Sequence, residues 1–314
     1  MVSRIAFGCE AIGGTDWGKV DEQESLSAVQ RALDKGINFF DTADVYGVGR
    51  SERILSKGLG SNKKNVVIGT KFGVNWETDP NGGRAKTFFD STPKRAVEAL
   101  ESSLRRLQLD CIPLYQIHWP DPKTPISDTL EVLIKAREAG KIRYIGVSNF
   151  SIAHISQAYQ FVELASVQLG YNLLDHSTSD EIVKHCRELN TGVIAYGALA
   201  QGLLTGKYGL AANFGNDDRR SRLIQFQKAE LHKNLEIVNN LREIGDRYHK
   251  SPAQVAIRWV LDQPSVTCAA IGIKTSDQVE ENVASTDWRL GQEDADYLGA
   301  LSSTTQATAF ESET

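Results

Sequence analysis

The chain has 314 residues, of which 41% are apolar and 24% are charged, and its formal net charge is −5. This length suits one large barrel or two ordinary domains, and the composition is that of a soluble globular protein with a substantial core. The slight excess of acidic side chains, 40 against 35 basic ones, argues against a surface that binds nucleic acid or an anionic membrane.

The cysteines and the N-terminus narrow the class of protein further. The four cysteines are far apart in the chain and form neither a zinc-binding nor a disulfide pattern. The first residues contain no apolar core of a signal peptide, and no run of about 18 apolar residues could span a bilayer. We therefore expect a cytoplasmic protein with no metal site and no membrane partner.

Short apolar runs recur along the chain at intervals of roughly thirty residues, and they predict strands buried on both faces of a parallel sheet. In chain order, the runs cover residues 5–7, 39–40, 66–68, 112–117, 144–147, 166–169, 192–196 and 267–271.

Helical patterns lie between these runs, and an alternation of strands and helices implies a parallel sheet. In one predicted helix, which opens at Thr92-Pro93, we expect Val97 to share the buried face with Ala96 and Leu100. Eight such units predict a (β/α)₈ barrel that forms a single domain over residues 1–314. A doubly wound open sheet is the rival, but no G-x-G-x-x-G motif opens the first helix. The predicted helices include residues 26–33, 93–107, 130–137, 180–189 and 253–261.

Two segments do not fit the barrel repeat. Residues 201–233 are long, polar and charged, and they follow the seventh predicted strand, where a long loop is a candidate lid over the cofactor or substrate site. Residues 302–314 are polar, and we expect them to form a frayed tail.

Four polar residues stand at or just after predicted strand ends, where barrels build their active sites. Asp41 ends the second strand and Tyr46 follows it, while Lys71 and His118 end the third and fourth strands. Each alone has a structural interpretation, such as a turn-forming role for Asp41. Together they can support carbonyl reduction, in which Tyr46 gives a proton to the oxygen and Lys71 lowers the pKa of Tyr46. Asp41 would hold Lys71 charged, and His118 would orient the carbonyl group.

These residues and their surroundings resemble the aldo-keto reductases, in particular the bacterial stress-type reductases related to potassium-channel β subunits. The resemblance runs from about Ile5 to Leu301. It implies a barrel that uses NADPH or NADH without a metal, and a catalytic tetrad made of the four residues above with the tyrosine as general acid. The most specific stretches are 39–51 (FFDTADVYGVGRS), 70–72 (TKF), 117–121 (IHWPD), 145–150 (IGVSNF) and 278–282 (QVEEN).

The same resemblance implies which residues hold the cofactor. A cation at Lys274 favours NADP(H) over NAD(H), although relatives often have an arginine where this chain reads Ile271–Lys274. Arg219 or Arg220 is a further candidate for the 2′-phosphate. The matching residues are Ser148, Asn149 and Gln168 for the carboxamide, Tyr196 for stacking on the nicotinamide, Leu199, Gly202, Leu203 and Lys207 for the pyrophosphate, and Gly272, Lys274, Gln278, Glu281 and Asn282 for the adenosine end, the last three sharing one helix face.

The substrate is indicated only as a small carbonyl compound. Trp17, Trp76 and Trp119 follow strand ends and suit an apolar pocket, or alternatively a cap over the core. The sequence favours an NADP(H)-dependent aldehyde and ketone reductase. The alternatives are a cofactor-sensing regulatory module, a sugar or polyol dehydrogenase, and a Schiff-base lyase with Lys71 as nucleophile, which Asp41 disfavours. Both a monomer and a homo-oligomer are compatible with the sequence.

Overall fold

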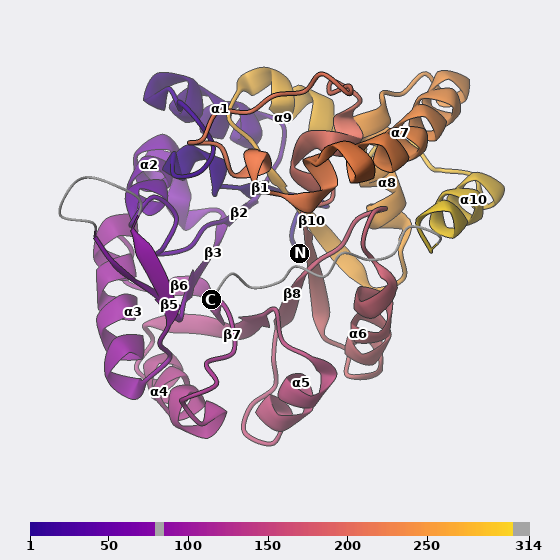
Figure 1. The fold of residues 1–314 in the computed structure, drawn as a ribbon. Helices are drawn as coiled ribbons and strands as arrows, with labels where there is room; N and C mark the ends of the chain where they lie inside the picture. The colour runs from indigo at the N-terminus through magenta and orange to yellow at the C-terminus, as the bar shows by residue number, and fades with distance from the viewer. Residues whose placement is uncertain (79–84, 304–314) are drawn as a thin grey trace.

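A computed structural model describes residues 1–78 and 85–303, and in these residues eight parallel strands form a closed barrel with helices around it (Figure 1). The strands follow one another around the barrel in chain order, and the last pairs with the first to close it. The predicted (β/α)₈ barrel is confirmed. Its strands are β1 (Ile5–Gly8), β2 (Phe39–Asp41), β3 (Val67–Phe72), β6 (Ile112–Ile117), β7 (Ile142–Ser148), β8 (Ser166–Gly170), β9 (Gly192–Tyr196) and β10 (Val266–Gly272).

The helices pack against the outside of the barrel, and local sequence signals fix several of their starts. The Thr92 hydroxyl accepts from the Arg95 N–H at the start of one, and Ser251 and Gln254 form a reciprocal capping box at the start of another. The α-helices are α1 (Glu22–Asp34), α2 (Arg50–Leu59), α3 (Pro93–Leu107), α4 (Ile126–Glu138), α5 (Ile152–Tyr159), α6 (Ser177–Glu188), α7 (Lys228–Tyr248), α8 (Pro252–Asp262), α9 (Ser276–Val283) and α10 (Gln292–Ser303).

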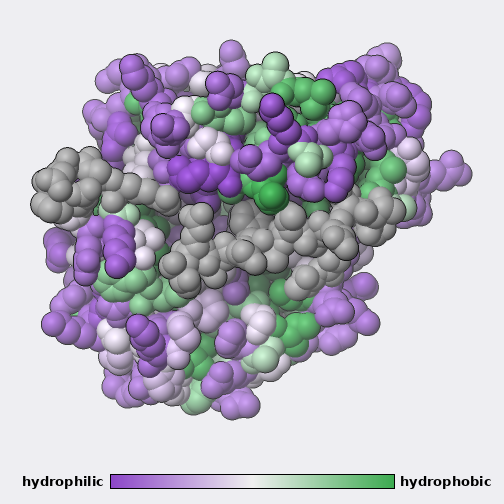
Figure 2. All heavy atoms as spheres, in the orientation of Figure 1, coloured by the Kyte–Doolittle hydropathy of each residue, from purple (hydrophilic) through white to green (hydrophobic). Residues whose placement is uncertain are grey.

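The core has two layers because successive residues of a strand point to opposite faces. Phe7 and Phe40 pack together toward the helices with ring centroids 5.7 Å apart, whereas their neighbours Ala6 and Phe39 belong to a smaller, separate cluster that includes Cys268. On the face of the molecule drawn in Figure 2, hydrophilic residues predominate on the helices at the rim. No helix within residues 1–78 and 85–303 is long and apolar enough to cross a membrane.

Several details differ from the sequence-based expectations. Val97 is 49% exposed, because a step of one residue along α3 turns it away from the face on which Ala96 and Leu100 are buried. The 201–233 segment is not one loop: it contains three short 3₁₀ turns, and α7 begins within it. The expected 302–314 tail begins inside α10, and residues 304–314 lie outside the described residues. An antiparallel hairpin, β4 (Val74–Glu77) and β5 (Lys86–Phe89), follows β3 and was not predicted.

Candidate active site

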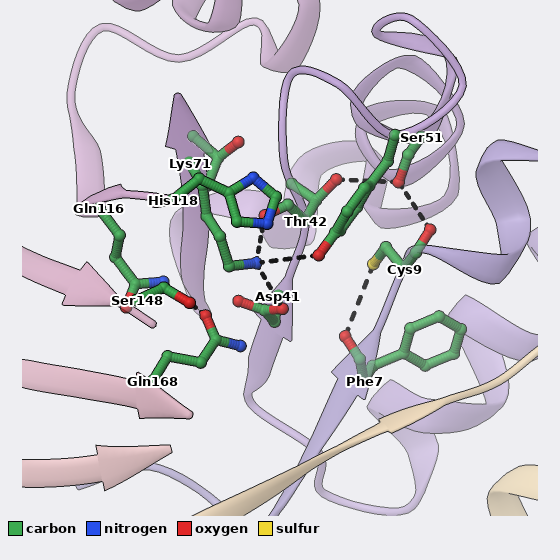
Figure 3. A network of polar contacts seen from close by, with 12 residues as sticks. Phe7, Cys9, Asp41, Thr42, Ser51, Lys71, Gln116, His118, Ser148 and Gln168 are labelled. Atoms are coloured by element: carbon green, nitrogen blue, oxygen red, sulfur yellow. Dashed lines mark hydrogen bonds and ion pairs between the residues drawn. The ribbon is translucent and has the colours of Figure 1, made fainter. Parts of the chain in front are cut away.

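The four residues of the expected tetrad meet at one end of the barrel. Lys71, near the end of β3, is 1% exposed. Its amine donates to Asp41 Oδ2 at 2.8 Å and to the carbonyl oxygen of Thr42 at 2.9 Å, and it lies 3.5 Å from the Tyr46 hydroxyl oxygen (Figure 3). The ring of His118 meets the ring of Tyr46 edge-on, with centroids 5.7 Å apart. The amine of Lys71 thus joins Asp41 to Tyr46.

The backbone of the turn after β2 determines where Tyr46 lies. The Thr42 and Asp44 N–H groups donate to carbonyl oxygens of β3, so the turn is attached to the strand that carries Lys71. Gly47 has a φ of +58°, and a Cβ atom there would lie 2.2 Å from the carbonyl oxygen of Gly13. Only glycine fits this close approach, which holds the turn against the loop after β1.

The electrostatics of Tyr46 correct one expectation. Desolvation of its hydroxyl, followed by the nearby negative charges of Glu10 and Asp41, raises the pKa of Tyr46 well above its usual range. We expected Lys71 to lower this pKa, but burial raises it, and the positive charge that opposes the rise is that of Arg219. The phenol therefore carries its proton at neutral pH and can act as a donor.

His118 is uncharged for a related reason. Burial, together with the positive charge of Lys71, lowers the pKa of its imidazole well below the usual range. Its Nδ1 atom is buried and has no hydrogen-bond partner among residues 1–78 and 85–303. Buried polar atoms are normally satisfied, so an unpaired ring nitrogen beside Tyr46 is consistent with a group that receives a ligand.

The residues expected at the nicotinamide lie at the ends of β7, β8 and β9. Asn149 has a φ of +60°, and its amide donates to the Ser148 hydroxyl and to the carbonyl oxygen of His118, both at 3.0 Å. The Tyr196 hydroxyl donates to Asn149 Oδ1 at 2.7 Å. The side chain of Gln168 is buried, and its Oε1 accepts from the Gln116 amide at 3.1 Å. All four expected residues are thus positioned by neighbouring polar groups near the tetrad.

The segment expected at the pyrophosphate has an unusual backbone. Leu199 precedes a 3₁₀ turn (Ala200–Thr205) in which three successive residues have positive φ, of 45°, 54° and 93° at Ala200, Gln201 and Gly202. Leu203, in the same turn, is fully buried. Two non-glycine residues in the left-handed region cost free energy, and such strain is concentrated at functional sites.

The residues expected at the adenosine end divide into two groups. The Lys274 amine donates to the carbonyl oxygen of Trp17, and Gln278 Oε1 accepts from the Lys274 N–H at 2.7 Å. Burial, then the positive charges of Arg220 and Lys207, lower the pKa of Lys274, so three cations act on one region. In the other group, the Glu281 carboxylate accepts from Ser251 at the start of α8, Asn282 is buried, and Gly272 ends β10.

The three tryptophans expected around the substrate each have a protein partner. The Trp17 ring lies beside the guanidinium groups of Arg219 and Arg220, at 5.7 and 6.0 Å. Trp76, on β4, lies beside the Arg95 guanidinium at 5.1 Å. The ring centroids of Trp119 and Phe89 are 6.1 Å apart.

Two ion pairs near the site were missed from the sequence. Asp44, completely buried, pairs with Arg95 at 2.9 Å, and Glu10 pairs with Arg219 at 2.7 Å. The partners are 51 residues apart in the first pair and 209 in the second, so no local spacing pattern could predict that they meet. The second aspartate of the D-T-A-D stretch was the one available indication for Asp44.

Comparison with known proteins identifies the family to which this barrel belongs. The chain belongs to the aldo/keto reductase family, whose sequence profile matches residues 4–303. The aldo-keto reductase YhdN of Bacillus subtilis is 39% identical over 95% of this chain and 89% of its own length. The NADP(+) aldo-keto reductase yakc of Schizosaccharomyces pombe is 32% identical over 90% of this chain and 83% of its own.

A solved structure is similar over nearly its whole length. The glycerol dehydrogenase AKR11B4 from Gluconobacter oxydans superposes with a TM-score of 0.89 and 37% identity, covering 97% of this chain and 93% of that one. The holo form of AKR11C1 from Bacillus halodurans gives a TM-score of 0.78 with 27% identity, covering 96% and 92%. The protein is therefore an enzyme of the oxidoreductase class.

Proposed function

We propose that this protein reduces small aldehydes and ketones to alcohols with NADP(H), using Asp41, Tyr46, Lys71 and His118 as its catalytic residues. The observation that carries the proposal is the buried Lys71 amine, which lies within 3.5 Å of the Tyr46 oxygen and pairs with Asp41 at 2.8 Å. A protonated phenol, an ammonium and a neutral imidazole at one end of the barrel suit the stabilisation and protonation of a developing alkoxide.

Each residue has a distinct role in this proposal. When bound, the nicotinamide supplies the hydride to the carbonyl carbon. Tyr46 donates its proton to the carbonyl oxygen, and the positive charge of Lys71 stabilises the phenolate that remains. Asp41 holds Lys71 in place, and the neutral His118 donates a hydrogen bond that orients the carbonyl group.

The preference for NADP(H) is supported by charge. Lys207, Arg220 and Lys274 act on one region near the end of β10, with Asp218 and Glu24 as the opposing carboxylates. A 2′-phosphate would satisfy these cations, whereas the 2′-hydroxyl of NADH would not. The left-handed run at Ala200–Gly202 supports the pyrophosphate site that we propose beside it.

A cover over this cofactor site is part of the proposal. The 216–222 segment lies against the loop after β1 through the Trp17–Asp218 bridge, the Arg219 N–H donating to Asp16 at 3.0 Å, and an Arg222–Asp16 ion pair. All of these contacts are made by residues that precede α7. The lid that we propose is therefore the part of residues 201–233 before α7, and not the whole segment predicted from the sequence.

The test is steady-state oxidation of NADPH and NADH with a panel of aldehydes, in the wild type and in Tyr46→Phe. Turnover that requires Tyr46 and prefers NADPH supports the proposal. Tight binding of NADPH without turnover of any carbonyl compound would instead favour a cofactor-sensing regulatory module.

A second candidate is oxidation of a polyol in the reverse direction, and the similarity to a glycerol dehydrogenase favours it. The same residues would serve, because the phenolate of Tyr46 can accept the proton that the phenol donates in reduction. Comparison of kcat/KM for glycerol with NADP⁺ and for glyceraldehyde with NADPH distinguishes the two directions.

A further inference from the structure

The loop after β1 places a carboxylate next to the tetrad. The Cys9 N–H donates to the carbonyl oxygen of Asp41 at 2.8 Å, and the Ser51 hydroxyl donates to the carbonyl oxygen of Cys9 at 2.8 Å. Cys9 is fully buried, so its neighbour Glu10 starts from a fixed backbone position, and its side chain is 39% exposed. Glu10 therefore presents a carboxylate, partly in contact with solvent, beside the strand end that carries Asp41.

The 216–222 segment supplies the partner of this carboxylate. Arg219 Nη1 donates to Glu10 Oε1 at 2.7 Å, and the guanidinium lies 5.7 Å from the centre of the Trp17 ring. The Arg219 N–H also donates to the Asp16 carbonyl oxygen at 3.0 Å. The arginine is held by its backbone, by its ion pair and by an aromatic face, and its side chain is still 32% exposed.

This ion pair acts on the residues at which the proposed reaction takes place. Burial raises the pKa of both Tyr46 and Tyr196, the negative charge of Glu10 acts in the same direction, and the positive charge of Arg219 opposes the rise. Glu10 follows the end of β1 by two residues, and Gly8 at that end pairs with Asp41, so the ion pair lies at the same end of the barrel as the tetrad. The hydrogen bonds that the Lys71 amine donates to Asp41 and Thr42 involve neither member of the ion pair.

The chemistry of the pair selects among carbonyl compounds. A carboxylate accepts hydrogen bonds and a guanidinium donates them, so a hydroxyl group, which does both, can bind to either. An apolar substrate would remove water from two charges and return no hydrogen bond. An anionic substrate would meet the Glu10 carboxylate as well as Arg219.

We propose that the Glu10–Arg219 pair is the specificity-determining element of the site and binds hydroxyl groups next to the reacting carbonyl carbon. The favoured substrates are then small, neutral, polyhydroxylated aldehydes and ketones and the corresponding polyols. This assignment depends on the reductase function proposed above.

The experiment compares glyceraldehyde with propanal, which has the same carbon skeleton without the hydroxyl groups. Hydrogen bonds to charged groups contribute about 1.5–3 kcal/mol, so the wild type should prefer glyceraldehyde in kcat/KM by about 10- to 100-fold. The double variant Glu10→Leu/Arg219→Leu should bring this ratio to within about threefold of unity, since both charged partners are lost. The kcat/KM for propanal should be retained or increased.

A matched control and a binding measurement separate the outcomes. Arg247→Leu removes an arginine of α7 whose partner, Asp294, is on α10, and it should leave the ratio unchanged. Arg220, and not Arg219, is the arginine that acts on Lys274, whereas Arg219 pairs with Glu10, so we assign the 2′-phosphate to Arg220. The Kd of NADPH, measured by fluorescence titration, should then be the same in the double variant and the wild type.

Three results would overturn the assignment. They are an unchanged glyceraldehyde-to-propanal ratio in the double variant, an equal loss for both aldehydes together with weaker NADPH binding, and a wild-type preference for the anionic succinic semialdehyde over glyceraldehyde. Absence of turnover of every aldehyde by the wild type would instead refute the proposed function itself.

Discussion

The buried Asp44–Arg95 pair makes a prediction about stability that depends on pH. Asp44 has no exposed surface; its Oδ2 accepts from Arg95 at 2.9 Å, while its Oδ1 is buried and has no partner in the part of the chain that the structure describes. Burial raises the pKa of Asp44 to about 7, with the nearby Arg95 acting in the opposite direction. The perturbation is Asp44→Asn, which keeps the shape of the side chain and removes the charge.

The sign follows from comparing the folded with the unfolded chain. An aspartate has a pKa of 3.8 when solvated, so the folded chain holds this proton more tightly than the unfolded chain does. The stability that results is fully present below about pH 4 and is lost as the pH rises through about 7. At about 1.4 kcal/mol per unit, the total loss is about 4 kcal/mol, of which about 2.5 kcal/mol falls between pH 5 and pH 8.

The assay is urea unfolding of the wild type and of Asp44→Asn at pH 5 and pH 8. The free energy of unfolding of the variant, relative to that of the wild type, should rise by about 2.5 kcal/mol between the two pH values, because the amide does not ionise. Asp110→Asn, which removes an exposed carboxylate from the loop after α3, is the matched control. A difference between Asp44→Asn and the wild type that is the same at both pH values would refute the reasoning.

Three further predictions concern Tyr46, Lys274 and Gly47. Tyr46→Phe should lower kcat by about 10²- to 10⁴-fold with an unchanged Kd for NADPH, since the proton donor alone is lost, and rapid turnover would remove Tyr46 from that role. Lys274→Met should raise the Kd of NADPH by about 10- to 100-fold but not that of NADH, because a charge-assisted contact is lost; equal losses would contradict the 2′-phosphate assignment. Gly47→Ala should cost about 3 kcal/mol in urea unfolding, because the added Cβ lies 2.2 Å from the Gly13 oxygen, whereas Gly140→Ala, also at positive φ but with open space around the added Cβ, should cost about 1 kcal/mol. Equal costs for the two alanine variants would mean that the close approach is not what requires glycine.

The barrel could be predicted from the sequence because strands that are buried on both faces consist of continuous apolar runs. Continuous apolar runs such as residues 112–117 and 192–196 gave two strands with their observed bounds. The hairpin after β3 was missed because its residues are partly exposed and carry no such run. The wrong placement of Val97 shows that an apolar residue need not be buried when its helix already has a complete apolar face.

The positions of the candidate catalytic residues could be predicted from the sequence, but the shift in the pKa of Tyr46 could not. Strand ends indicated where Asp41, Lys71 and His118 lie, because parallel strands bring their carboxyl ends together. The direction of the Tyr46 pKa shift depends on desolvation and on Glu10, which are properties of the folded chain. The partner of Glu10 is 209 positions away, and no local pattern indicates such a contact.

The pairing of the first strand with the last has a consequence for synthesis on the ribosome. Ile5 pairs with Ala269, which is 264 positions later in the chain. At roughly 5–20 residues per second, the edge of β1 that faces β10 waits about 15–50 s for its partner to be made. An unpaired strand edge can bind other chains, so the nascent protein passes through an open-barrel stage that is prone to aggregation, and the yield of folded enzyme depends on protecting that edge until translation ends.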